Sequence, residues 1–145
     1  MSISGIEMTN SQKNMSFGNG RKYTAVLALN KDWAEIVTTA ISRVAESKQG
    51  SLLPVNFGTP ERVLNHLNQL SRANRPDLVV ITDHSASNIQ SVVDIAREKG
   101  CKPEQIIIIS ENAQRPAAKG ATCVQKGYGL IGSFLEAVQK AFNGN

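Results

Sequence analysis

The chain has 145 residues, of which 41% are hydrophobic and 19% charged, and its formal net charge is +4. This length predicts one domain with a sizeable core, and the sequence contains neither an apolar run long enough to cross a membrane nor a secretory signal. Because Cys101 and Cys123 lack metal-site spacing, we expect a reduced, cytoplasmic protein.

The positive charge is spread along the sequence. Residues 1–22 contain Lys13, Arg21 and Lys22 against Glu7, and the rest of the excess is distributed over the remaining chain. No basic run is interleaved with aromatic residues. We therefore expect neither a nucleic acid nor a membrane as partner.

The N-terminal part predicts a flexible tail followed by a strand and a helix. Residues 1–21 are rich in Ser, Asn and Gly without periodicity, which leaves 22–145 as the folded domain. A strand is predicted over Tyr23–Leu29, and a helix follows, capped by Asn30 or Asp32. Apolar residues recur at helical spacing and form its expected buried stripe: Trp33, Ile36, Val37, Ala40, Ile41 and Val44.

The next segment predicts an edge strand and a second helix. Leu53, Val55 and Phe57 alternate with polar residues, and Pro54 interrupts the run, as is typical of an edge strand. Thr59 then precedes Pro60, a cap followed by proline at the first helical position. The expected buried stripe of this helix is Val63, Leu64, Leu67 and Leu70.

The second half of the chain predicts three strands and two helices. The apolar runs at residues 78–81, with Thr82 close behind, and 106–109, closed by Ser110, are typical of strands buried on both faces. A helix is expected between them over residues 87–99. Only residues 111–120 separate the second run from a polar edge strand at 121–125, so a helix there is expected to be lost or reduced to a turn. A last helix is predicted over residues 130–142, with one apolar face: Leu130, Ile131, Phe134, Leu135, Val138 and Phe142.

Alternating strands and helices predict an α/β fold with a parallel sheet and right-handed crossovers. The second and fifth strands are edge-like, whereas the other three are apolar. The strand order 2-1-3-4-5 satisfies this pattern, and it is the flavodoxin-like doubly wound order.

Several polar residues follow the strands and should meet at the carboxyl edge of this sheet. They are Asn30, Lys31, Asp32, Thr82, Asp83, His84, Ser110 and Lys126. Two carboxylates, Asp32 and Asp83, could hold Mg²⁺, and Asp83 could attack a phosphoryl donor. Lys126, Ser110 and Thr82 could then stabilise the charge on the phosphoryl oxygens. Asp83 and Asp32 could equally cap the helices that follow them.

From Lys22 to Asn143, this arrangement resembles the receiver domain of two-component response regulators. The resemblance places Asp83 at the phosphoacceptor position, Ser110 at the end of the fourth strand and Lys126 at the end of the fifth. The acidic pair of that family is reduced to Asn30-Lys31-Asp32, and Gly127 stands where a proline usually follows the lysine. The resemblance also implies a partner surface over Ala113–Phe142, including Lys126 and Tyr128.

Three functions follow from these observations. The first is a stand-alone, divergent receiver-like domain (a pseudo-receiver) of bacterial signalling, which is not an enzyme, needs no cofactor and binds a protein partner or forms a homodimer. The second is a single-domain response regulator phosphorylated on Asp83 with Mg²⁺ held by Asp83 and Asp32. The third is a small module that binds a nucleotide or phosphate ligand at Lys126 and Gly127–Gly132, whose spacing matches G-x-G-x-x-G. A tight turn with close helix packing also explains these glycines.

Overall fold

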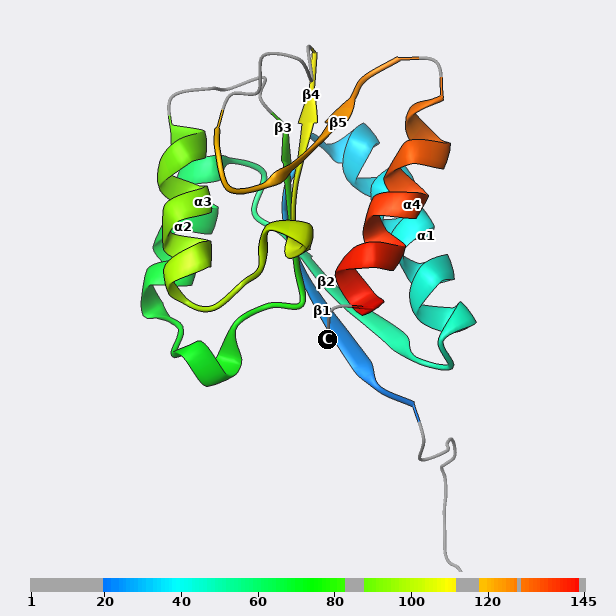
Figure 1. Ribbon diagram of the computed structural model, residues 1–145, viewed down its shortest axis with the longest axis horizontal. Coiled ribbons are helices and arrows are strands. Elements are labelled where there is room, and N and C mark those ends of the chain that lie inside the picture. Colours follow the sequence, from blue (N-terminus) through cyan, green and yellow to red (C-terminus); the bar gives the residue numbers. More distant parts are fainter. Residues whose placement is uncertain (1–19, 83–87, 112–117, 128, 144–145) are drawn as a thin grey trace, which may run out of the picture.

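The computed structural model describes residues 20–82, 88–111, 118–127 and 129–143. Figure 1 shows one sheet between two layers of helices. Its strands are β1 (Lys22–Ala28), β2 (Ser51–Asn56), β3 (Leu78–Thr82), β4 (Ile106–Ser110) and β5 (Thr122–Gln125). Its helices are α1 (Lys31–Ser47), α2 (Pro60–Gln69), α3 (Ile89–Glu98) and α4 (Leu130–Asn143), with short 3-10 turns η1 (Arg72–Asn74) and η3 (Pro103–Gln105).

The sheet is entirely parallel, and its order is β2-β1-β3-β4-β5. The predicted flavodoxin-like α/β fold is therefore confirmed. Helices α1 and α4 cover one face of the sheet, and α2 and α3 cover the other (Figure 1). No regular helix joins β4 to β5 among the residues that the structure describes, although residues 112–117 lie outside them. None of the described helices is long and apolar enough to cross a membrane.

The core consists of two apolar layers because alternate strand residues point to opposite faces. Val80 and Ile107 contact the layer under α1 and α4, whereas Val79 and Ile106 contact the layer under α2 and α3. Strands β3 and β4 are covered on both faces, which explains their continuous β-branched and leucine sequences.

The helix starts agree with the expected caps. The Asn30 side chain accepts a hydrogen bond from the Trp33 N–H, and the Thr59 side chain accepts one from the Arg62 N–H. Asp32 lies in the first turn of α1, so of the two predicted caps Asn30 is the one used.

Two residues of the predicted buried helical stripes are exposed, and Leu64, Leu70 and Leu135 are partly buried. Ile36 of α1 is 51% exposed and Ile131 of α4 is 46% exposed. Helical spacing places them beside the buried stripe, but the sheet is covered by their neighbours Val37 and Leu130 instead. Phe134 is buried as predicted, and Trp33 is partly buried against the core.

Asp77 fastens the start of β3 to β1. Its carboxylate accepts hydrogen bonds from the Thr24 N–H at 2.9 Å, the Thr24 hydroxyl at 3.3 Å and Arg21 Nη2 at 2.7 Å. We expect Asp77→Ala to lower the free energy of unfolding by about 2 kcal/mol, because the partly buried Thr24 N–H loses its acceptor. Urea unfolding measures this change. The control Asp94→Ala removes an exposed carboxylate that, within the described part of the chain, accepts a hydrogen bond from Gln90 alone, and a loss of equal size there would contradict the explanation.

Candidate functional site

A small pocket lies at the carboxyl edge of the sheet. Its volume is about 170 Å³, and its lining residues come from the ends of β1, β3 and β5 and from the starts of α1 and α2. They are Ala28, Asn30, Trp33, Gly58, Pro60, Thr82 and Lys126. Asn30, Thr82 and Lys126, three of the residues expected at the carboxyl edge, thus line one pocket.

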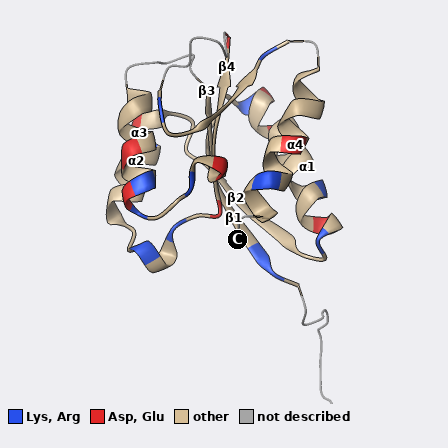
Figure 2. Ribbon diagram, viewed as in Figure 1, with Lys and Arg blue, Asp and Glu red and all other residues tan. Residues whose placement is uncertain are grey.

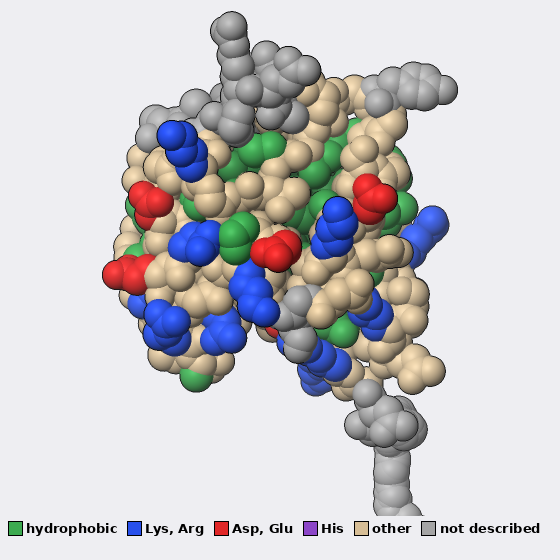
Figure 3. All heavy atoms as spheres, viewed as in Figure 1, with side chains coloured by type: hydrophobic (Ala, Val, Ile, Leu, Met, Phe, Trp, Pro, Cys, Tyr) green, Lys and Arg blue, Asp and Glu red, His purple; other side chains and the backbone are tan. Residues whose placement is uncertain are grey.

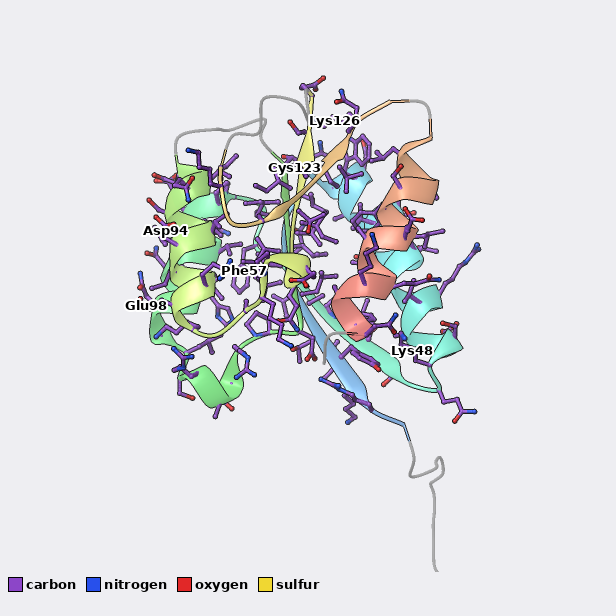
Figure 4. The ribbon with its side chains drawn as sticks, viewed as in Figure 1. Lys48, Phe57, Asp94, Glu98, Cys123 and Lys126 are labelled. Carbon is purple, nitrogen blue, oxygen red and sulfur yellow. The ribbon has the colours of Figure 1, made fainter. Side chains whose placement is uncertain are left out.

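Lys126 is the only charged side chain among the described residues that line this pocket. Figure 4 shows it at the upper end of the sheet, where β5 leads towards α4. Its Nζ lies 3.1 Å from Oε1 of Glu111 and 6.0 Å from the centroid of the Trp33 ring. The Lys126 side chain is 16% exposed and that of Glu111 is 68% exposed, so most of this ion pair's desolvation falls on the lysine.

The backbone holds Lys126 at this position. Its N–H donates to the Ser110 carbonyl at 2.8 Å and continues the ladder between β4 and β5. Ser110 itself is completely buried and does not line the pocket. We expected the Ser110 hydroxyl to lie beside Lys126 in the pocket, but Ser110 is not among the described residues that line it.

The acidic residues of the predicted metal site are not both described. Asp32 is exposed in the first turn of α1 and does not line the pocket. Asp83 and His84 lie outside the described residues, as does Tyr128 of the predicted partner surface. Within the described ranges, no three His, Cys, Asp or Glu side chains gather closely enough to hold a metal ion.

Asn56 positions this edge and was not singled out in the sequence. Its side-chain amide donates to the Leu29 carbonyl at 2.9 Å, and its side-chain oxygen accepts from the Leu29 N–H at 3.0 Å. These two bonds extend the pairing of β2 with β1 by one residue and so fix where the chain turns into Asn30. In the sequence, the one sign of this role was the position of Asn56 at the end of the predicted edge strand.

The glycines before α4 form a turn. Gly127 and Gly129 have φ angles of +120° and +88°, which favour glycine, and the Leu130 N–H donates to the Gly127 carbonyl. A side-chain carbon at Gly127, Gly129 or Gly132 would meet no atom within 4 Å. The tight turn is thus present, but the expected close helix packing is not.

A groove runs from this turn between α1 and α4. Its first part has a volume of about 360 Å³ and contains Trp33, Ile36 and Ile131 together with the turn glycines. Its second part, of about 340 Å³, again contains Ile36 and Ile131 and continues along the two helices. The remaining residues of this second part are Glu35, Thr39, Ala40, Arg43 and Leu135. We call the two parts together the α1–α4 groove.

The chain matches no model of a known protein family and no curated protein sequence.

Proposed function

We propose that the chain is a divergent receiver-like regulatory domain that acts by binding an amphipathic helix of a partner protein in the α1–α4 groove. The observation that carries the proposal is the exposure of Ile36 and Ile131, two large apolar side chains that face the same groove from different helices. Exposed apolar surface of this kind is typical of an interaction site.

The shape and charge of the groove favour a helix as occupant. From Trp33 to Arg43 the groove follows about three turns of α1, which is the length over which an amphipathic helix presents anchors at i, i+3 or i+4 and i+7. Glu35 and Arg43 stand on its rim with opposite charges. A partner helix with a basic residue near Glu35 and an acidic residue near Arg43 would be oriented by these two charges.

A photo-crosslinking amino acid placed at Ile131 tests this proposal. We expect it to capture a protein whose crosslinked peptide is an amphipathic helix, whereas the same group at Ser91, on α3 across the sheet, captures none of it. Crosslinks from Ile131 to a second copy of this chain would overturn the proposal in favour of a homodimer. Equal capture from Ser91 would also overturn it.

The alternative function, phosphorylation of Asp83 with Mg²⁺, gives a separate prediction. Because Asp32 does not line the pocket around Lys126, and Lys126 is paired with Glu111, we expect acetyl phosphate and Mg²⁺ to produce no phosphoryl adduct. Intact mass of the wild type and of Asp83→Asn measures this. An adduct on the wild type alone would support the phosphorylated regulator, and Mg²⁺ would then also change the fluorescence of Trp33.

A further inference from the structure

Basic residues gather at the amino edge of the sheet, opposite the carboxyl-edge pocket. They come from three separate segments: the start of β1, the connection from α2 to β3, and the last turn of α3 with its connection to β4. Figures 2 and 3 show Lys and Arg concentrated at the end of the molecule where β1 begins. We call this set the amino-edge patch; it consists of Arg21, Lys22, Arg72, Arg75, Arg97, Lys99 and Lys102, with the acidic residues Asp77, Glu98 and Glu104 between them.

Two guanidinium groups of this patch converge over Gly100. A side-chain carbon built at Gly100 would lie 3.2 Å from Cδ of Arg75 and 3.5 Å from Nη2 of Arg72. Arg72 Nη1 donates to the Glu98 carbonyl at 2.6 Å, and Arg75 Nη1 donates to the Arg72 carbonyl at 2.8 Å. Main-chain oxygens thus hold the two groups in place without neutralising their charges.

A polar cavity adjoins these arginines. Its volume is about 290 Å³, and the charged side chains that line it are Arg21, Arg75, Lys102 and Asp77. Asp77 is already bound to Arg21 and Thr24. Burial raises the pKa of the neighbouring Cys101 thiol to about 11, while the charge of Arg75 acts in the opposite direction.

Bringing like charges together is unfavourable unless an anion binds between them. Guanidinium groups bind phosphate oxygens through two parallel hydrogen bonds, and the four arginines of the patch suit phosphates that repeat along a chain. An acidic protein partner would need an apolar centre to its interface, and the cavity offers only Ala73 and Pro76 for this purpose. Tyr23, the aromatic residue beside Arg21, is buried and stacked on Phe142, so it offers no platform for unpaired bases.

We propose that the amino-edge patch binds the phosphate backbone of a nucleic-acid duplex, without reading its base sequence. This inference is independent of the proposed function, because the α1–α4 groove and the amino-edge patch share no residue.

Fluorescence anisotropy with labelled duplex DNA and duplex RNA of about 20 base pairs tests the proposal. For three or four phosphate contacts, log K should fall with log[salt] with a slope of about −3. The variant Arg72→Gln with Arg75→Gln should bind at least about 10-fold more weakly at low salt and reduce the slope by about 2. The matched control, Lys31→Gln with Arg62→Gln, removes the same charge from the starts of α1 and α2 and should bind like the wild type.

Three outcomes would overturn the proposal: equal binding by the double-arginine variant, equal weakening by the control, or tighter binding to poly-glutamate or to phosphatidylserine vesicles than to either duplex. If circular dichroism shows that the arginine variant unfolds, Lys22→Gln with Lys99→Gln replaces it, since this pair leaves the hydrogen bonds of Arg72 and Arg75 in place. If log K of the wild type, measured beside this second variant, hardly changes with log[salt], that result would equally contradict phosphate binding.

Discussion

A variant with Ile36→Asp and Ile131→Asp is expected to keep its fold and to lose affinity for the helical partner by at least about 100-fold. Both side chains are about half exposed, so their replacement removes little buried area from the core. In the complex, however, the new carboxylates would be buried against apolar anchors of the partner helix, and burying an unpaired charge is costly. Isothermal titration calorimetry with the helix identified by crosslinking measures the loss.

Val55→Asp is the matched control for this experiment. Val55 is exposed to the same extent as Ile36, at 51%, but it lies on the edge strand β2 instead of in the groove. The control should therefore bind the partner like the wild type. If it loses affinity as strongly as the double variant, the interface includes the exposed side of β2 and the groove is not the site.

The edge strand itself is poorly suited to add a strand from another protein. The N–H groups of Ser51 and Phe57 donate to β1, so by alternation the N–H groups of Leu52 and Asn56 face the free side, with Pro54 between them. Because proline has no N–H, the free edge lacks its central donor. The exposed apolar side chains of β2 thus lie on an edge that cannot pair fully with an added strand. The α1–α4 groove is therefore the better supported interface.

The strand order could be predicted from the sequence because burial and connection rules leave few alternatives. The apolar runs of β3 and β4 require cover on both faces, while Pro54 and the polar residues of β5 are tolerated at edges. The same rules place Thr82 and Lys126 at one edge of the sheet, where both line the pocket. They could not predict that Glu111, directly after β4, reaches Lys126, because this depends on side-chain conformation at the edge.

The amino-edge patch illustrates a second limit of sequence patterns. The patch combines three short basic segments around Arg21, Arg75 and Lys102, and at least 27 positions separate any two of these residues, so no single window of the sequence contains the whole cluster. A parallel sheet nevertheless brings the starts of its strands to one edge, just as it brings their ends to the other. The positive charge is dispersed along the sequence, as expected. On the surface, however, the fold gathers part of it at the amino edge of the sheet.

The exposed residues of the groove show a third limit, which concerns helical periodicity. A stripe of apolar residues wider than the contact with the sheet predicts burial for all its members. In α4 the sheet side is formed by Leu130, Phe134 and Val138, and the flank that carries Ile131 and Leu135 faces α1 instead. The flank of α1 that carries Ile36 faces it across the groove. Periodicity alone cannot separate the two sides of such a stripe.

Phe134→Ala and Ile131→Ala make this distinction measurable on one helix. Phe134 is 1% exposed within the core under α1 and α4, so its truncation should lower the free energy of unfolding by about 3 to 5 kcal/mol, through lost burial and the cavity left behind. Ile131, three residues earlier in the same apolar stripe, should cost less than about 1 kcal/mol, because almost half of its surface is already in contact with water. Urea unfolding followed by circular dichroism gives both values. Losses of similar size would mean that α4 buries both residues in solution, and the α1–α4 groove would then be too shallow to receive a helix.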